Sequence, residues 1–134
     1  MRPRYLLDTN VLVDILRGTK GDARKRLLEI GIDHCAVSEI TVYELYCGAA
    51  ASASPEANQK AVETLLALIE ILPLQKAYLE AARQKASQRK AGTPVEDFDL
   101  LIGCTALCDS RILLTGNRKH MERIAGLELE DWGE

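Results

Sequence analysis

RYLLDTNVLVDIL occupies residues 4–16, and this stretch decides how the chain starts to fold. Its YLL run at residues 5–7 is short and wholly apolar, which is typical of a strand buried on both faces. Apolar residues then recur at helical spacing over residues 11–16. Asp8 therefore lies at the carboxyl end of a strand, where the loops of an open α/β sheet form a ligand-binding crevice. Capping of the following helix by Asp8 or Thr9 is the competing interpretation.

Strands and helices alternate along the rest of the chain. Pro73 separates two helical patterns, which predicts an antiparallel helical hairpin standing against the sheet. The alternation itself predicts a parallel sheet with right-handed crossovers. Besides the first strand and helix, we predict strands at 35–38, 111–115 and, at an edge, 127–129, and helices at 21–30, 39–48, 56–71, 74–91, 99–108 and 117–124.

The length of the chain predicts one domain, residues 1–134. A hydrophobic content of 47% with 28% charged residues is ordinary for a soluble globular protein. The small, polar residues 49–58 form the one plausible hinge, and they are too few to separate domains. No window approaches the roughly 18 apolar residues of a membrane span, and residues 1–4 lead into a strand instead of a secretory apolar region. We therefore expect a cytoplasmic protein with no membrane partner.

Four acidic or amide side chains lie where a strand gives way to a helix, or inside the helix that follows. They are Asp8, Glu44, Asp99 and Asn117. Glu44 is flanked by apolar and aromatic residues, where a carboxylate is costly to bury unless a positive charge meets it. Magnesium or manganese would supply that charge, because hard cations prefer carboxylate and water oxygens. The competing interpretation of Glu44 is a surface position between half-buried tyrosines.

Basic residues are unevenly distributed, although the net charge of −3 gives no bulk electrostatic support for a nucleic-acid partner. Runs of basic residues usually mark a solvated helix face. If such runs converge on the acidic pocket, they would hold a phosphate backbone. The residues that we expect to contact such a backbone are Arg83, Arg89, Arg118 and Lys119.

The four cysteines have no CxxC spacing and no histidine at zinc-type spacing, so we predict buried thiols and no zinc site. They are Cys35, Cys47, Cys104 and Cys108.

Four segments resemble the signature segments of PIN-domain ribonucleases, in the same order along the chain. They read LDTNVL at 7–12, YELYCG at 43–48, PVEDFDLLIGCTA at 94–106 and LTGN at 114–117. More narrowly, they resemble the VapC toxins of bacterial toxin–antitoxin pairs. The resemblance implies an α/β, PIN-like three-layer fold, in which a central parallel sheet of about four to five short strands is flanked by helices.

The resemblance also implies a catalytic site for metal-dependent hydrolysis of RNA phosphodiester bonds. Asp8, Glu44 and Asp99 match the three main acidic positions and would bind Mg²⁺ or Mn²⁺. Asn117 matches the fourth polar catalytic position. Bound metal would lower the pKa of a water and stabilise the leaving oxygen.

Neighbouring polar residues would support these four through hydrogen bonds. Thr9, Asn10 and Thr115 are the expected supports, although plain helix capping competes for Thr9 and Asn10. Asp97 is open between an accessory acid, a cap and a solvated neighbour. His34 and His120 lie outside the signature segments, so no Ser/His/Asp or Cys/His arrangement is predicted.

VapC-like toxins imply partners as well as a reaction. The expected substrate is RNA, with tRNA favoured and initiator tRNA the first candidate. A VapB-type antitoxin would lie across the acidic groove, often with an Arg near the metal site, and would silence the enzyme. A homodimer is expected, with a heterotetramer or larger assembly when the antitoxin is bound. The alternative function is a non-catalytic PIN-like metal-binding or regulatory module.

Overall fold

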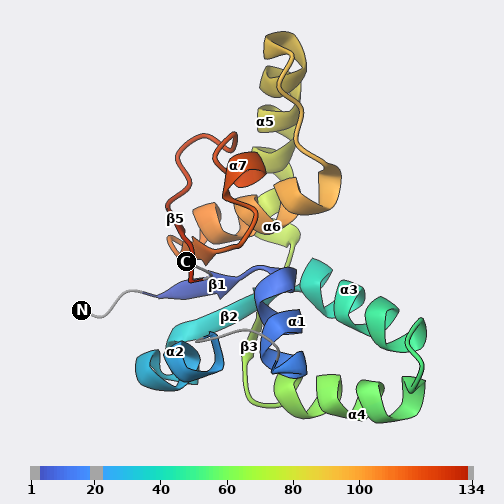
Figure 1. Cartoon of the computed structure of the whole chain (residues 1–134). Helices are drawn as coiled ribbons and strands as arrows, with labels where there is room; N and C mark the ends of the chain where they lie inside the picture. Colours follow the sequence, from blue (N-terminus) through green and yellow to red (C-terminus); the bar gives the residue numbers. More distant parts are fainter. Residues whose placement is uncertain (1–3, 19–22, 133–134) are drawn as a thin grey trace.

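A parallel five-stranded sheet forms the centre of the protein (Figure 1). The computed structural model describes residues 4–18 and 23–132. All neighbouring strands run parallel, in the order β3-β2-β1-β4-β5. The strands are β1 (Tyr5–Leu7), β2 (Cys35–Ser38), β3 (Glu70–Leu72), β4 (Ile112–Leu114) and β5 (Leu129–Glu130).

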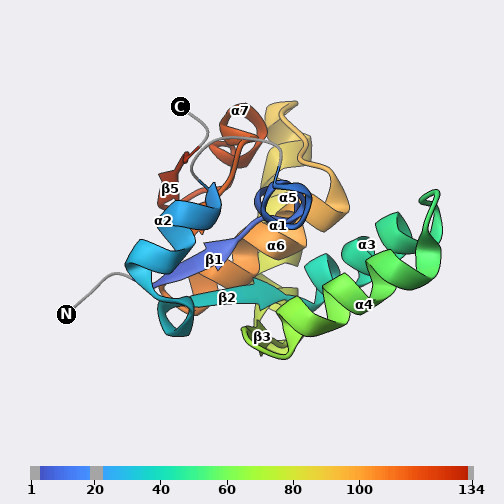
Figure 2. The ribbon, with the colours of Figure 1, turned by 60° about the horizontal axis from the view of Figure 1, so that its bottom comes forward.

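Helices cover both faces of the sheet and complete three layers (Figure 2). One face is covered by α1 (Thr9–Arg17), α2 (Ala23–Ile30), α3 (Glu39–Ala50) and α4 (Pro55–Leu66). The other face is covered by α5 (Tyr78–Ala91), α6 (Asp97–Cys108) and α7 (Arg118–Met121). Short 3-10 turns at Ile32–His34 and Gln75–Ala77 precede β2 and α5. The predicted α/β three-layer fold with a central parallel sheet is confirmed.

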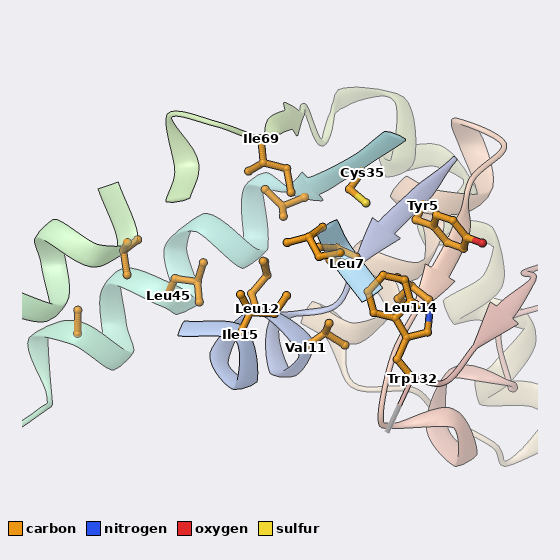
Figure 3. Packing of buried hydrophobic residues seen from close by; sticks show 14 residues of the cluster. Tyr5, Leu7, Val11, Leu12, Ile15, Cys35, Leu45, Ile69, Leu114 and Trp132 are labelled. Carbon is orange, nitrogen blue, oxygen red and sulfur yellow. The ribbon is translucent and has the colours of Figure 1, made fainter. Parts of the chain in front are cut away.

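Alternate residues of the buried strands supply two separate cores, because successive side chains of a strand point to opposite faces. Leu7 and Leu114 pack in the core on the α1 side, whereas Leu6 and Leu113 pack in the core on the α6 side. Figure 3 shows the first of these cores, which the ring of Trp132 closes. This two-sided burial explains why the strands read as continuous apolar runs.

The predicted helix at 56–71 is wrong at its end, and the predicted hairpin with 74–91 is wrong with it. Helix α4 stops at Leu66, and residues 70–72 form the edge strand β3, in which Ile71 pairs with Val37. Because β3 separates α4 from α5, α4 packs against α3 and α5 packs against α6. The apolar spacing was compatible with a helix, but pairing with β2 overrides that local preference.

Other predicted boundaries moved by a few residues. The predicted hinge 49–58 shrinks to residues 51–54, since α3 reaches Ala50 and α4 begins at Pro55. The edge strand expected at 127–129 is β5, Leu129–Glu130. The starts of two predicted segments, residues 1–3 and 21–22, lie outside the described residues.

Two of the four cysteines are buried as predicted, Cys35 and Cys104. Cys47 and Cys108 are exposed, because they lie in the outer turns of α3 and α6 and face away from the core. Within the part of the chain that the structure describes, no helix is long and apolar enough to cross a membrane.

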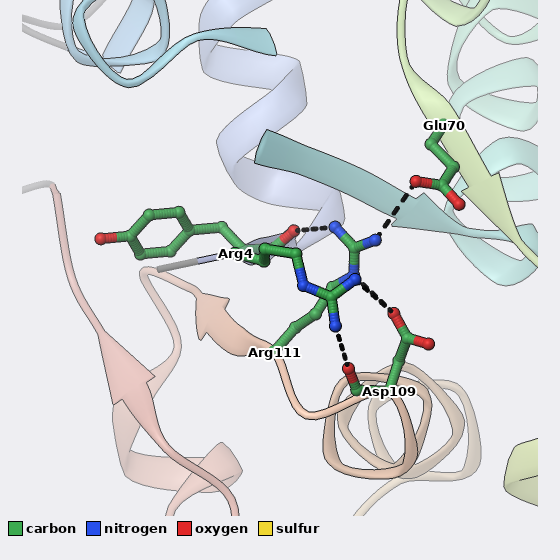
Figure 4. Close-up of polar contacts among 5 residues, drawn as sticks. Arg4, Glu70, Asp109 and Arg111 are labelled. Atoms are coloured by element: carbon green, nitrogen blue, oxygen red, sulfur yellow. Dashed lines mark hydrogen bonds and ion pairs between the residues drawn. The ribbon is translucent and has the colours of Figure 1, made fainter. Parts of the chain in front are cut away.

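A buried arginine ties the strands together at the amino-terminal edge of the sheet (Figure 4). The Arg111 side chain is only 3% exposed, and its Nε donates to Asp109 Oδ2 at 2.6 Å. Its two terminal nitrogens donate to the Tyr5 carbonyl at 3.3 Å and to Glu70 Oε1 at 3.2 Å. Arg4 also donates to the backbone carbonyl of Asp109. The guanidinium is therefore matched by acceptors from β1, from β3 and from the end of α6, as a buried charge requires.

Close packing of α6 against the segment after α7 depends on Gly103. A Cβ added there would collide with Ile124 and lie 3.2 Å from Leu127 Cδ2. We expect Gly103→Ala to lower the free energy of unfolding by about 1–2 kcal/mol, because overpacking outweighs the gain in helix propensity. Gly48→Ala on α3 is the matched control, since a Cβ there meets nothing within 4 Å. Urea unfolding should show this control stabilised by about 0.5–1 kcal/mol; equal effects of the two substitutions would contradict the packing argument.

Candidate functional site

Parallel pairing of β1 with β4 brings two predicted site residues together at the carboxyl edge of the sheet. Leu7 is in register with Leu114, and the backbone N–H of Asp8 donates to the Leu114 carbonyl at 2.8 Å. The residues that follow these strands, Asp8 and Thr115, are therefore neighbours. The Thr115 hydroxyl donates to Asp8 Oδ2 at 2.7 Å.

Asp8 is both a helix cap and a member of the acidic site, so the two interpretations of this residue are compatible. Its Oδ1 accepts the backbone N–H of Thr9 at 2.8 Å at the start of α1. The side chain of Thr115 engages the other carboxylate oxygen. Burial raises the pKa of Asp8, which is 4% exposed, while these two hydrogen bonds oppose the rise.

Glu44 is held toward Asp8 by the first residue of α1. The Thr9 hydroxyl donates to Glu44 Oε1 at 2.6 Å and lies 2.9 Å from the hydroxyl of Thr41. Because the single Thr9 proton is given to the carboxylate, Thr41 must donate in the second contact. Glu44 is half-buried at this position and belongs to the site, although its neighbours Tyr43 and Tyr46 are exposed.

Asp99 lies within the electrostatic field of the other two carboxylates. Its pKa is raised to about 6, first by burial and then by the charges of Asp8, Glu96 and Glu44. His120 opposes this rise. Acids from the end of β1 and from α3 therefore lie near enough to Asp99 on α6 for their charges to make its ionisation less favourable.

These carboxylates suit a hard divalent cation that keeps part of its water shell. The described residues include no preformed cluster of three or more His, Cys, Asp or Glu side chains that could enclose a metal ion. Magnesium does not need such a cage, because it commonly binds through one or two carboxylates and retains several waters. The raised pKa of Asp99 supports this fit, since an added cation relieves repulsion among the acids.

Asn117 is connected to the acidic site by a hydrogen bond from its backbone, whereas its side chain contacts His120. Its N–H donates to the Thr115 hydroxyl at 2.9 Å, which continues the chain of hydrogen bonds to Asp8. Its side-chain Oδ1 lies 2.7 Å from His120 Nδ1. The catalytic assignment of Asn117 remains a prediction.

Asp97 and Asn10 are the predicted supporting residues that lie outside this cluster. Asp97 is exposed and forms an ion pair with Lys85 of α5. It is also absent from the charges that raise the pKa of Asp99. Asn10 is exposed in the first turn of α1.

Thr41, Glu96 and His120 were missed by the sequence analysis. Thr41 precedes Glu44 by three residues, a spacing that places both on one side of α3. Glu96 caps α6, where its Oε2 accepts the N–H of Asp99 at 3.3 Å. His120 follows Asn117 by three residues, and this spacing could have connected it to the site.

The four predicted RNA contacts are exposed, but they are not gathered into one cluster with the acids. Arg83 pairs with Glu80 on its own helix at 3.9 Å. Arg89 lies in the last turn of α5, which projects from the body of the protein (Figure 1). Arg118 and Lys119 form the start of α7, beside His120. Their role in RNA binding remains a prediction.

Comparison with known proteins places this geometry in a family. The sequence pattern of the PIN domain matches residues 5–127. The tRNA(fMet)-specific endonuclease VapC of Salmonella typhimurium is 30% identical over 130 residues, which cover 96% of this chain and 98% of that protein. Ribonuclease VapC2 of Haemophilus influenzae is 32% identical with the same coverage. The solved DNA-bound VapBC complex from Salmonella typhimurium superposes with a TM-score of 0.90 at 30% identity, covering 97% of this chain and 98% of that one.

Repulsion at Asp99 predicts that the free energy of unfolding of the metal-free protein falls as the pH rises. Because the folded-state pKa of about 6 exceeds the ordinary value of 3.8, the stabilising contribution of Asp99 is present at low pH and is lost as the pH rises through about 6. We expect Asp99→Asn to melt above the wild type by a margin that grows as the pH rises from about 4 to about 6 and then levels off. Added Mg²⁺ should reduce that margin.

Asp97→Asn is the matched control, because Asp97 is paired with Lys85 and does not raise the pKa of Asp99. Its melting temperature should show no such gain over the same pH range. Thermal melts followed by circular dichroism measure both variants, and a pH-independent margin for Asp99→Asn would contradict the assignment.

Proposed function

The chain belongs to the PIN-domain family, and from that premise we propose that it is a metal-dependent endoribonuclease, the toxin of a toxin–antitoxin pair. One observation carries the proposal: threonine hydroxyls hold the carboxylates of Asp8 and Glu44 near Asp99, where burial and then the charges of these acids raise the pKa of Asp99 to about 6. Such a group of acids gains stability from a divalent cation, because the cation offsets the repulsion among them. Relatives of nearly equal length named as ribonucleases support the same activity.

Asp8, Glu44 and Asp99 are the residues that would hold Mg²⁺ or Mn²⁺. When bound, the metal supplies a water of lowered pKa and positive charge beside the scissile phosphate. The protein orients its ligands through hydroxyl groups: Thr115 aligns Asp8, and Thr9 aligns Glu44. These contacts fix the carboxylate oxygens before substrate arrives, as preorganised catalysis requires.

Asn117 and the basic start of α7 would contact the RNA backbone beside the acids. Asn117 caps α7, and the exposed Arg118 and Lys119 follow it directly. Cationic side chains there would offset the repulsion between the acidic site and phosphate. Arg83 and Arg89 on α5 would extend the contact to more distant phosphates.

Transfer RNA is the proposed substrate, and initiator tRNA is the first candidate within that class. This finer assignment is supported by the relative named a tRNA(fMet)-specific endonuclease, which is aligned over 96% of this chain. Incubation of total RNA with the purified protein, with and without Mg²⁺, tests it when the cut ends are mapped by sequencing. Cuts at one site in one tRNA support the assignment, whereas no metal-dependent cut at any protein concentration favours a non-catalytic module.

Asp99→Asn should lower the metal-dependent cleavage rate by at least about 100-fold. Loss of a residue that only hydrogen-bonds to a metal ligand typically costs about 10- to 100-fold, and loss of the ligand itself should cost more. Asp97→Asn should stay within about threefold of the wild type, since it changes only an exposed ion pair. Initial rates on the mapped RNA measure both. Equal losses in the two variants would show that Asp97 belongs to the site.

An antitoxin of the VapB type is the proposed partner, and a groove beside the acids suits its inhibitory segment. The groove has a volume of 230 Å³ and lies between α1, α3 and α4. Apolar side chains including Val13, Leu45 and Val62 line it, and Glu44 and Arg17 are its charged lining residues. A helical or extended segment whose apolar side chains fit this lining and whose arginine pairs with Glu44 would match the groove. We further propose a homodimer that becomes a heterotetramer or larger assembly with antitoxin.

Ala61→Arg should weaken antitoxin binding by at least about tenfold while leaving RNA cleavage intact, because a long charged side chain would fill an apolar groove. Gln59→Arg, which adds the same charge to the exposed side of α4 outside the groove, is the matched control. Titration of each variant with the cognate antitoxin, read as residual cleavage, measures the effect. Full inhibition of Ala61→Arg at wild-type antitoxin concentrations would place the partner elsewhere.

A further inference from the structure

An aromatic pair lies at the boundary between α3 and α6, immediately beside two of the acidic residues. The rings of Tyr43 and Phe98 are 6.0 Å apart between centroids, with their planes at 87°. Tyr43 directly precedes Glu44, and Phe98 directly precedes Asp99. Aromatic residues make up only 4% of this chain, so composition alone does not explain two of them at this position.

At least one ring face of Tyr43 is not used in its contact with Phe98. In an edge-to-face pair, one ring offers its edge and keeps both faces, while the other uses a single face. Whichever ring offers the edge, a face of Tyr43 therefore remains outside the contact. Its side chain is 58% exposed, which agrees with an open face.

Two neighbours restrict the orientation of this ring. Phe98 contacts it from α6, and Cys47 lies one helical turn further along α3 on the same side of the helix. A tyrosine phenol is uncharged at physiological pH, so the ring adds no charge that would repel phosphate. The ring is thus a neutral and partly preorganised surface, which reduces the entropy lost on binding.

Nucleobases are the ligands that such a surface fits. Proteins that bind unpaired RNA stack its bases on exposed aromatic rings while cationic groups follow the backbone. We propose that Tyr43, braced by Phe98, is a stacking platform for an unpaired nucleobase next to the scissile phosphate. The inference rests on the proposed ribonuclease function and adds to it a requirement for an unstacked base at the cleavage site.

Binding of two labelled decamers tests the platform: one is oligoadenylate, and the other has the same ribose-phosphate backbone without bases. Fluorescence anisotropy is measured on the full chain with Ca²⁺ in place of Mg²⁺ to suppress cleavage. The wild type should prefer oligoadenylate. Tyr43→Ala should weaken oligoadenylate binding by about 5- to 100-fold and leave binding of the abasic decamer unchanged.

Two further variants separate stacking from other roles. Tyr43→Phe should retain oligoadenylate binding, because stacking needs the ring and not the hydroxyl. Tyr78→Ala is the matched control, since Tyr78 on α5 is also 58% exposed. Lys85 of α5 pairs with Asp97 at the start of α6. Tyr78 lies seven residues before Lys85, so it is about 10 Å from Lys85 along the axis of α5.

Several results would overturn the proposal. Wild-type protein that binds both decamers equally, or binds neither, has no base platform. Equal weakening of both decamers by Tyr43→Ala would indicate a general loss of the site. If Tyr43→Ala changes the oligomeric state measured by light scattering but not the binding of either decamer, this face is instead a contact between copies of the chain. Metal-dependent cleavage of total RNA is measured in a separate experiment. The two experiments can therefore contradict the stacking platform without contradicting the nuclease function, or the reverse.

Discussion

The alignment of β1 with β4 is the constraint on which the site depends. Their register makes Asp8 and Thr115 the first residues beyond two neighbouring strands, and the hydrogen bond between their side chains follows from it. A slip of one residue would exchange the side chains that these strands give to the two cores, and it would break the backbone hydrogen bond from Asp8 to the Leu114 carbonyl. Hydrophobic packing on both faces therefore determines where the first carboxylate is placed.

Neutral hydroxyl groups hold the acids of the site, whereas cations hold acids elsewhere in the fold. Asp97 is paired with Lys85, and Asp109 with Arg111. At the site, the donors to Asp8 and Glu44 are threonine hydroxyls and a backbone N–H. A hydroxyl orients a carboxylate without cancelling its charge, so negative potential is retained for an external cation. Burial is the first cause of the raised pKa of Asp99, and the charges of Asp8 and Glu44, which no cation cancels in these contacts, add to it.

The alternation of strands and helices predicted the parallel sheet, and the resemblance to PIN-domain ribonucleases implied the three layers and the acidic positions. Contacts between distant segments could not be predicted in either way. Local spacing favoured a helix through residues 70–72, and only the neighbouring β2 makes that segment a strand. His120 was set aside because it lay outside the signature segments, although its ring contacts Asn117 one helical turn away. Asp97 was ambiguous because it lies only two residues from Asp99, and the sequence does not show which way each side chain points. The ion pair between Asp97 and Lys85 of α5 distinguishes the two acids. Each of these outcomes depends on a partner that local sequence does not name.

Glu44 belongs both to the acidic site and to the lining of the groove. If the protein is a ribonuclease toxin, as proposed, this shared residue links inhibition by the antitoxin to catalysis. Its carboxylate accepts from Thr9 within the acidic site, and the same residue lines the groove between α1, α3 and α4. An arginine carried into the groove beside Glu44 would meet the charge that a metal ion also requires, so antitoxin and metal would compete for one carboxylate. Because the competing charge is positive in both cases, the protein can exchange one for the other without rearranging its sheet. Inhibition then needs no conformational switch, only a segment whose apolar residues bind the groove firmly enough to keep the arginine in place.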